Sequence, residues 1–537
     1  MGVRKRAARM AALALGIMWA SGAAASNAWG LTYCVANPGC VTGGGVSQPD
    51  VQSALTAAAG NGGDDTVRVG TGTFQAAGPG GFTYSGVAGN TVQLVGAGQN
   101  QTILTAPNVN GSSVTTLDVE MASGGGSTIS DLAVHLPGAS GSGQSTGIFA
   151  IGADIDHVAV TTPLTVNGGS MGIFFQTGTL QHSTVSVPQG LGGVAAVRVI
   201  ADGSGTIADS TLSGYYGIYG DASSTPTMIT ARRDRIDATG GNAGIYTKGT
   251  SLTAEDVLIQ TNGTGVHTFC LAALDGTSTL RNVTITGAPI FGLYDECATN
   301  GRTATINLDS SIIDNPSFSI FRDGNGPSGG TPNVVTSYSD YPDSTGSIAG
   351  SAGSLTETSV MRVDPKFVNA AAQDFRLRFD SPLLDLGNPT NSGGSSDLDG
   401  LTRVVNGRLD MGAFEYQRRP PSAVATVSPG AVTAGQAVTF DGTASSDPDP
   451  GDTIGYAWTF DDGTTATGPI ASHVFTAPGS HTGTLTVTDS TNLHASATAA
   501  VVAEPTGQRA AALGKCKKKK SAHARKKCRK RAKRLPL

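Results

Sequence analysis

Aromatic and titratable side chains recur at a fixed place in a repeated phrase. The phrase is a small residue, an aliphatic residue and a third, usually aromatic residue, and it occurs eight times between residues 147 and 321. In a strand whose aliphatic residue faces inward, the next residue faces outward. The third residues would then form one outer column, made of Phe149, Phe174, Arg198, Tyr219, Tyr246, His267, Tyr294 and Phe321.

Such a column offers one kind of binding chemistry. Exposed rings stack on the flat faces of sugars, and a tyrosine adds a hydroxyl for hydrogen bonding. We therefore select Tyr219, Tyr246, His267 and Tyr294 as candidate glycan-binding residues. The alternative is that the rings cover neighbouring turns of the chain, as cross-strand aromatic pairs do.

A second set of side chains lies two positions after each third residue. Its members Glu296 and Asp323 should be in register on adjacent turns, with Asp295 and Arg322 beside them. Two carboxyl groups about 5 Å apart would suit a retaining glycosidase or a Ca²⁺ ion. The alternative is a solvated acidic rim on an acidic protein.

The six cysteines fall into three near pairs. Cys270 and Cys297 each lie five residues after the first residue of a phrase, at Gly265 and Gly292, so they occupy one position in successive turns. Stacking would bring their Cα atoms to about 5 Å, a distance that a disulfide accepts. We also expect Cys34–Cys40 and Cys516–Cys528 disulfides. No pair has the spacing of a zinc site.

These residues must be positioned by a stack of short strands. The copies are 21 to 27 residues apart, and each unit carries a second run of alternating apolar and polar residues, such as 280–285. A fixed period of this length indicates one structural unit stacked on itself. Without helical periodicity, a coil of parallel strands that rises about 4.8 Å per turn is the natural solution. A β-propeller would need about 40 residues per blade.

Over residues 30–418 the chain resembles the right-handed parallel β-helix proteins that bacteria secrete. The end of this stretch is similar to the choice-of-anchor Q family, through Asp364-Pro365-Lys366-Phe367, Asp374-Phe375-Arg376-Leu377, residues 381–387, Asp397-Leu398-Asp399-Gly400, Arg403 and residues 410–415. We expect an N-terminal cap over 29–85, with a helix that begins after Asp50, and a β-helix with the Q-like segment over 86–418. The Asn-Thr-Asp and Gly-His-Gly motifs of polygalacturonases are absent, and Asp156-His157 is only a two-residue match to an Asp-His pair of pectate lyases.

Four acids of the Q-like segment are candidate metal ligands. Asp385, Asp397, Asp399 and Asp410 lie near glycine-rich turns. Carboxylates in such turns usually accept hydrogen bonds from backbone amides, and a Ca²⁺ site is the alternative. Ca²⁺ is the one cofactor that the sequence leaves open.

Residues 419–503 are similar to a PKD domain, a small immunoglobulin-like sandwich. The similarity rests on residues 438–442, 445–449, 456–463 and 485–489, and Trp458 is the expected core residue between two sheets. Asp461 replaces a glycine that this family usually has. PKD domains mostly serve as spacers or interaction modules, so the resemblance implies no catalysis.

The two ends of the chain are basic. Residues 1–28 have a basic start, a short apolar stretch and small residues that fit signal-peptide cleavage. Residues 515–537 hold 13 Lys or Arg and no acid, and we expect a disordered tail over 504–537. Without the tail and four basic signal residues, 18 basic residues face 40 acidic ones, a net charge of about −22.

These observations predict an all-β, exported, cell-envelope-associated monomer. Its β-helix would bind an extended polysaccharide or envelope glycan without turnover, the PKD-like domain would be a spacer, and the tail would bind an anionic envelope polymer or a membrane surface. Nucleic acid is disfavoured as a partner because the body is acidic. A polysaccharide lyase or glycoside hydrolase is the alternative function, and a purely structural envelope component is a third.

Overall fold

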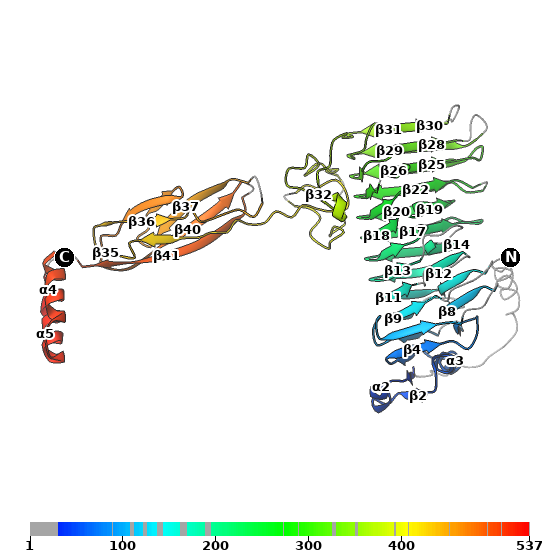
Figure 1. Ribbon diagram of the computed structural model, residues 1–537, viewed down its shortest axis with the longest axis horizontal. Coiled ribbons are helices and arrows are strands. Elements are labelled where there is room, and N and C mark those ends of the chain that lie inside the picture. Colours follow the sequence, from blue (N-terminus) through cyan, green and yellow to red (C-terminus); the bar gives the residue numbers. More distant parts are fainter. Residues whose placement is uncertain are drawn as a thin grey trace. The chain divides into compact units, whose positions relative to one another are not determined.

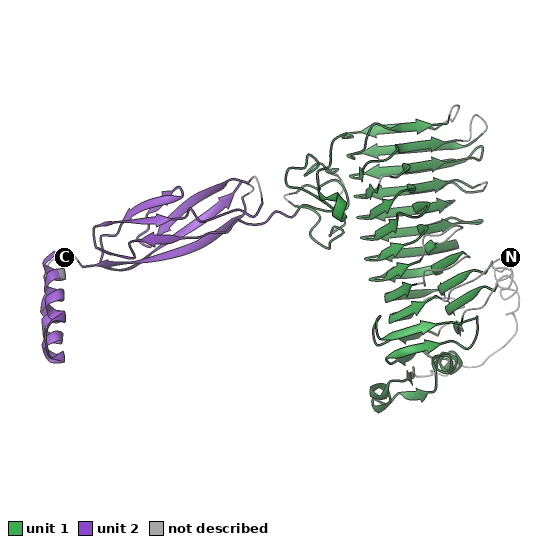
Figure 2. Cartoon of the chain, viewed as in Figure 1, with its two compact units in different colours: residues 1–416 green, residues 417–537 purple. Residues whose placement is uncertain are grey.

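A computed structural model describes residues 30–535, except for residues 88–89, 108–111, 122–125, 137–142, 162–168, 188–194, 272, 288, 325–328, 349–352, 391–393, 406, 450–451, 491 and 506. The signal peptide expected over residues 1–28 lies outside the described residues. The chain forms two compact units, residues 1–416 and 417–537 (Figure 2). No helix among the described residues is long and apolar enough to cross a membrane.

The first unit is a parallel β-solenoid, as the period predicts (Figure 1). Each turn contributes strands to three series, which we call series A, B and C. Series A contains β5 (Phe82–Gly86), β8 (Val114–Met121), β10 (Ser145–Ile151), the first part of β12 (Ser170–Gln181), the first part of β14 (Ala195–Ala208), β16 (Tyr216–Asp221), β19 (Ala243–Lys248), β22 (Thr264–Phe269), β25 (Phe291–Glu296), β28 (Phe318–Asp323) and β30 (Thr345–Ser347).

Series B and C form the other faces of the solenoid, and the longest strands bend from one face to the next. Series B contains β1 (Thr32–Val35), β3 (Asp65–Val69), β6 (Val92–Val95), the first parts of β9 (Ser127–His135) and β11 (Ala153–Thr161), the second parts of β12 and β14, β17 (Thr227–Arg232), β20 (Thr250–Glu255), β23 (Gly276–Arg281), β26 (Thr303–Asp309), β29 (Thr331–Ser337) and β31 (Leu355–Thr358). Series C contains β4 (Gly72–Gln75), β7 (Thr102–Thr105), the second parts of β9 and β11, β13 (Thr184–Ser186), β15 (Thr211–Ser213), β18 (Arg235–Ala238), β21 (Leu258–Thr261), β24 (Thr284–Thr286) and β27 (Ile312–Ile313).

A helix covers the first turn of the solenoid. Helix α3 (Val51–Asn61) begins after Asp50, whose carboxylate accepts a hydrogen bond from the amide of Ser53, and ends at Gly62 in the left-handed conformation. It buries Val51, Ala54, Leu55 and Ala58 against the core. The short helix α2 (Pro38–Thr42) and strand β2 (Val46–Gln48) complete this end.

One conformation recurs at the corner between series B and series C. A single residue of each turn adopts a left-handed backbone there, with φ between 45° and 57° in ten non-glycine cases. Left-handed residues redirect a strand sharply within one position. We call this row the corner ladder; it contains Asp131, His157, His182, Asp209, Arg233, Asp256, Asn282, Ser310, Tyr338 and Ser359.

Residues 364–416 leave the stack and fold back along it; we call this segment the clasp. Its only regular elements are β32 (Phe367–Asn369), the 3₁₀ turn η2 (Ala370–Ala372) and β33 (Asp374–Leu377). Leu398, Ala413 and Phe414 pack on Leu258 of β21, and Leu383 and Met411 pack near Ile312 of β27. The clasp thus buries apolar side chains that point outward from series C.

The second unit contains a β-sandwich of two sheets. One sheet has the order β34 (Thr426–Ser428), β36 (Ala437–Asp441), β39 (Ile470–Val474), and the other β35 (Ala431–Thr433), β41 (His494–Glu504), β40 (Gly479–Asp489), β37 (Ile454–Phe460), β38 (Thr465–Thr467). Trp458 is buried between them beside Phe440 and donates its indole N–H to the carbonyl of Gly468. This confirms the expected all-β sandwich.

The basic tail is helical, contrary to our expectation of disorder over residues 504–537. Helices α4 (Gly507–Lys517) and α5 (Ala522–Ala532) are joined by the Cys516–Cys528 disulfide. Alanine, lysine and arginine all favour helices, and Ser521 accepts a hydrogen bond from the amide of Ala524 to begin the second helix. The disulfide lowers the conformational entropy of the unfolded tail, and this stabilises the two helices against the repulsion of their like charges.

Candidate functional site

The small residue of each phrase lies where the series A strands approach the core. A Cβ atom on Gly217 would lie 2.2 Å from Ile236, and one on Gly244 would lie 2.2 Å from Ile259. Such distances leave no room for a side chain. The glycine therefore lets the strand sit close to series C, and the following aliphatic residue, such as Ile218 or Ile245, is fully buried.

The third residues of the eight phrases form a continuous row across series A. Phe149 pairs with Phe174, Phe174 with Arg198, and the register continues through Tyr219, Tyr246, His267, Tyr294 and Phe321. We call this row the aromatic column. Its members are less exposed than the sequence suggests: Phe149, Phe174 and His267 are buried, and the others are half-buried.

The reason for this burial is that the rings stack on one another. The rings of Tyr219 and Tyr246 lie 5.1 Å apart at 20°, and those of His267 and Tyr294 lie 4.4 Å apart at 15°. Neighbouring rings therefore cover each other's faces. This is the cross-strand pairing that the sequence left open as the alternative to rings exposed for sugar binding. Tyr246 and His267 meet at 88°, so the stack is broken between them. Edges and polar atoms face outward more than ring faces do.

A second row, charged except for Phe269 and called here the charged row, lies beside the aromatic column. Asp221, Lys248, Phe269, Glu296 and Asp323 are in register on successive turns. Arg198 lies 2.7 Å from Asp221 and over the ring of Tyr219. His267 Nε2 lies 2.9 Å from Glu296, and the hydroxyl of Tyr294 donates to Asp323 over 3.0 Å. The two rows are thus one connected surface.

Asp295 and Arg322 do not join this surface, although they are in register as expected. Residues alternate sides along a strand, so both point to the other side of series A from Glu296 and Asp323. Asp295 is fully buried, and burial raises its pKa to about 8. Arg322 donates to the carbonyl of Gly353. The grouping of all four side chains in one cluster was wrong for this geometric reason.

The tyrosines of the aromatic column remain protonated over the whole physiological range. Burial raises the pKa of Tyr246, with Tyr219 as the second cause, and the pKa of Tyr294, with Glu296 as the second cause. Burial also raises the pKa of Tyr216, which packs against both Tyr219 and Tyr246, to about 12. These phenols can donate hydrogen bonds and do not supply a base at neutral pH.

The four acids of the clasp mostly bind protein groups. Asp397 accepts from the amides of Asp399, Leu401 and Glu415, and Asp410 accepts from the amides of Asp385 and Tyr416. Asp399 pairs with Arg235 at 2.7 Å. These contacts favour the structural role over Ca²⁺ binding for Asp397, Asp399 and Asp410. Asp385 has a left-handed backbone, and its amide donates to Asp410.

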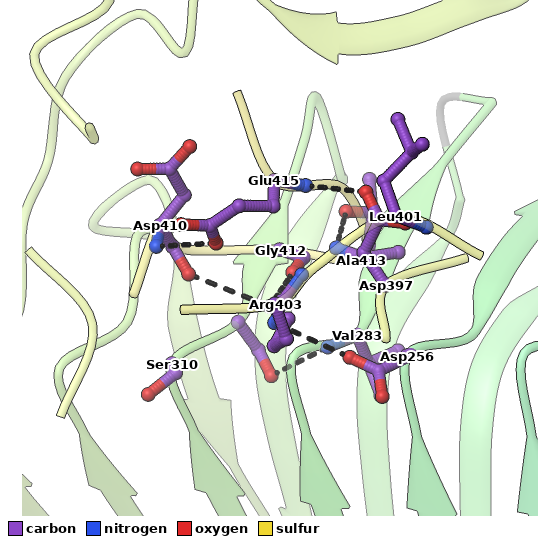
Figure 3. Close-up of polar contacts among 12 residues, drawn as sticks. Asp256, Val283, Ser310, Asp397, Leu401, Arg403, Asp410, Gly412, Ala413 and Glu415 are labelled. Atoms are coloured by element: carbon purple, nitrogen blue, oxygen red, sulfur yellow. Dashed lines mark hydrogen bonds and ion pairs between the residues drawn. The ribbon is translucent and has the colours of Figure 1, made fainter. Parts of the chain in front are cut away.

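A buried arginine connects the clasp to the corner ladder (Figure 3). Arg403 is fully buried, its Nε lies 3.4 Å from Asp256, and its Nη2 donates to the carbonyl of Gly412. Gly412 in turn donates to the carbonyl of Ser310, and Ala413 donates to the hydroxyl of Thr284. Burial, with Asp410 as a second cause, raises the pKa of Glu415 to about 8. Sequence reasoning listed Arg403 only as part of a motif.

All six cysteines lie in disulfides, Cys34–Cys40, Cys270–Cys297 and Cys516–Cys528. The Cα atoms of Cys270 and Cys297 are 4.9 Å apart, close to the distance that coil stacking predicts. This pair links adjacent turns just beyond the charged row.

Two groups of potential metal ligands were missed by sequence reasoning. Among the described residues, Asp156, His157 and His182 converge at the corner ladder, and Asp447, Asp452 and Asp489 converge in the sandwich. The first group could have been found from the 25-residue step between the histidines, which equals the step of the phrase copies at 147 and 172. The second depends on loop geometry that has no sequence period.

The sandwich matches a known family model. Residues 418–503 match the model of the PKD domain. The PKD1 domain of Vibrio anguillarum Epp is 27% identical over 17% of this chain and all of its own, with a TM-score of 0.15.

Solved structures similar to the solenoid are much more distant in sequence. Pectate lyase Pel9A is 11% identical over 73% of this chain and 97% of its own, with a TM-score of 0.45. A mannuronic acid-specific family 6 polysaccharide lyase from human gut microbiota is 12% identical over 63% of this chain and 84% of its own, with a TM-score of 0.39. No curated protein sequence matches the chain. The chain therefore combines a parallel β-solenoid with a PKD-type β-sandwich.

Proposed function

We propose that this chain is an exported protein that binds an extended polysaccharide along the aromatic column without cleaving it. The observation that carries this proposal is the unbroken register of Tyr219, Tyr246, His267 and Tyr294 on successive turns. Consecutive turns rise by about 4.8 Å, close to the length that one sugar unit adds to an extended chain. Each unit of a bound chain would therefore meet an equivalent set of edges, hydroxyls and charged groups.

The charges of the surface favour a neutral polysaccharide. Arg198 and Lys248 contribute two positive charges, and Asp221, Glu296 and Asp323 contribute three negative ones. A uronic acid polymer would meet net negative charge here and on the acidic body. Sugar hydroxyls, in contrast, can pair with both signs and with the tyrosine hydroxyls.

The non-catalytic part of the proposal follows from Asp295. Burial raises the pKa of this predicted catalytic residue to about 8, in the range of a general acid, and its side chain is fully buried. A catalytic acid must come within hydrogen-bond reach of its substrate. Asp295 cannot do so from the core side of the strand.

Catalysis remains a second candidate because of two contacts. His267 with Glu296 and Tyr294 with Asp323 place paired polar groups from adjacent turns on the outer side of series A. A lyase or a glycoside hydrolase would need such groups on one side of the substrate.

The experiment measures binding and turnover on the same polymers. Affinity electrophoresis with xylan and glucomannan as neutral polymers, and polygalacturonate and alginate as acidic ones, should show retardation by a neutral polymer. Tyr246→Ala should weaken this binding about tenfold or more, as expected for an aromatic hot spot. Met228→Ala is the matched control, since Met228 is 61% exposed but lies on series B.

Product formation separates the two candidates. Reducing ends and unsaturated products should not accumulate with any polymer that binds. Turnover that Glu296→Gln abolishes would overturn the non-catalytic proposal, and equal binding by wild type and Tyr246→Ala would reject the column as the binding surface.

The helical tail is the proposed retention element at the cell envelope. Residues of α5 such as Arg525, Lys526, Arg529 and Lys530 line one side of the hairpin. An anionic polymer or lipid surface would be held by these charges and released by salt. Full-length protein should elute from anionic vesicles at high salt, whereas a chain ending at Glu504 should not bind them.

A further inference from the structure

The corner ladder carries a group of side chains that the proposed function does not use. His157 and His182 occupy the same corner position on adjacent turns, with φ of 52° and 46°. Their rings stack with centroids 4.8 Å apart at 23°. Asp156 precedes the first histidine and points to the same outer edge, so that two imidazoles and one carboxylate converge from two turns of the solenoid.

The geometry of this group is compact. Asp156 Oδ1 lies 2.9 Å from His157 Nδ1 and 2.8 Å from His182 Nδ1. These are hydrogen-bond distances, and they place one oxygen and two nitrogens close enough together to share a single ion.

Solvent access leaves the group open to a cation. Both histidines are about half exposed, at 55% and 47% of their side chains, so a cation can reach them and the rings have room for the rotation that aims Nδ1 at it.

The nearest basic residue of the corner ladder is already paired. Arg233 lies two turns beyond His182 and makes two hydrogen bonds of 2.7 Å to Asp209, the residue between them in the ladder. Asp209 thereby neutralises that guanidinium. The next ladder residue on the other side of His157 is Asp131, which adds negative charge.

We propose that Asp156, His157 and His182 form a binding site for a late first-row divalent metal ion, with Ni²⁺ and Cu²⁺ preferred over Ca²⁺ and Mg²⁺. Two imidazoles and one carboxylate suit these ions, whereas Ca²⁺ and Mg²⁺ prefer oxygen ligands. Water would complete the coordination. Because the ligands come from two successive turns, the ion would fasten one turn of the solenoid to the next.

The test uses untagged, metal-stripped full-length protein titrated with Ni²⁺, Cu²⁺ and Ca²⁺ by calorimetry. Wild type should bind about one equivalent of Ni²⁺ or Cu²⁺, and Ca²⁺ should bind at least about tenfold more weakly at this site. The Cu²⁺ electron paramagnetic resonance spectrum should show coupling to two nitrogens. Binding should also raise the melting temperature in proportion to ligand occupancy.

The variants are chosen to keep the fold. His157→Asn and His182→Asn remove one imidazole each, and asparagine adopts the left-handed conformation readily; Asn282 already occupies this ladder. Each variant should lose the single bound metal ion or bind it about tenfold or more weakly. Any Cu²⁺ that still binds should show coupling to one nitrogen. His135→Asn is the control, because it removes an exposed imidazole from β9, elsewhere on the solenoid.

Two results would overturn the proposal. One is wild-type protein that binds neither Ni²⁺ nor Cu²⁺ with saturation, and the other is binding that survives in the His157→Asn/His182→Asn double variant. Circular dichroism of each variant checks that a loss of binding is not a loss of fold, and the unchanged binding of His135→Asn supports the assignment to the corner.

Discussion

The corner ladder has the same backbone at both ends of the solenoid but opposite surroundings. On the early turns, His157 and His182 project into solvent and meet Asp156 there. On the later turns, Asp256, Asn282 and Ser310 are buried under the clasp, where Arg403 and Gly412 reach them. The same backbone corner thus forms two different surfaces. We call Asp156, His157 and His182 the open edge, and Asp256, Asn282 and Ser310 the docking strip. The side chain at each corner, and whether the clasp covers it, decide its role.

The largest loss of stability is expected when the buried positive charge of Arg403 is removed. Arg403→Ala would leave Asp256 buried without its partner, a change that typically costs about 3–5 kcal/mol. Hydrogen exchange should then show lost protection over residues 364–416. Arg376→Ala is the control, because its pair with Asp374 is largely exposed and should contribute about 1 kcal/mol or less. Unchanged exchange in Arg403→Ala would show that apolar packing alone holds the clasp.

The later turns also contain a covalent link. Replacing Cys270 and Cys297 by serine opens a loop with a sequence separation of 27, which should cost about 3 kcal/mol in the unfolding free energy. The Cys34→Ser/Cys40→Ser variant opens a separation of only 6 and should cost about 1 kcal/mol less. Urea unfolding of the two double variants measures the difference. Equal losses would mean that loop entropy does not set the contribution of either link.

The two ends should respond to pH in opposite directions. Burial and Asp410 raise the pKa of Glu415 to about 8 from 4.5, so the folded clasp binds more protons than the unfolded chain between these values. Clasp stability should therefore fall as pH rises from about 4.5 to about 8. At the open edge, the pKa of Asp156 is lowered by folding. Its small contribution to the free energy of unfolding is therefore present above the pKa of the unfolded chain, and it is lost as the pH falls through the pKa of the folded protein.

Site-resolved hydrogen exchange at several pH values checks both signs. Glu415→Gln should flatten the dependence at the clasp, and Asp156→Asn should remove it at the open edge. A clasp that becomes more protected at high pH would contradict the assignment of Glu415.

The smallest effect is expected at the open edge without metal. His182→Asn keeps the left-handed backbone and removes only a half-exposed ring, so the unfolding free energy should change by about 0.5 kcal/mol or less. Thermal unfolding in the presence of a chelator measures it. A loss as large as that of Arg403→Ala would erase the distinction between the two ends.

Much of the fold could be predicted because it repeats. The spacing of the phrase predicted the stack, the outer register from Phe149 to Phe321 and the approach of Cys270 to Cys297. Helix α3 was expected to begin after Asp50, and it spans Val51–Asn61. In a periodic chain, the position of one residue predicts the position of the equivalent residue one turn away.

The remaining features depend on contacts that occur once. Arg403 meets Asp256 across 147 residues of sequence, and no repeat relates them. The alternation of sides along a strand separates Asp295 from Glu296, and this separation is already contained in the sequence because neighbouring strand residues face opposite sides. The exposure of the aromatic column was overestimated because the stacking of the rings depends on their tilt, which sequence does not contain.

The clasp can dock only on a surface that earlier residues have already built. Arg235, Asp256, Thr284 and Ser310 come from four successive turns, and each contacts the clasp. During synthesis the clasp emerges after all of them. A chain with a slipped or missing turn would therefore present Leu398 and Phe414 to solvent, where chaperones and proteases recognise apolar side chains. Docking of the clasp therefore requires that these four turns are wound in register.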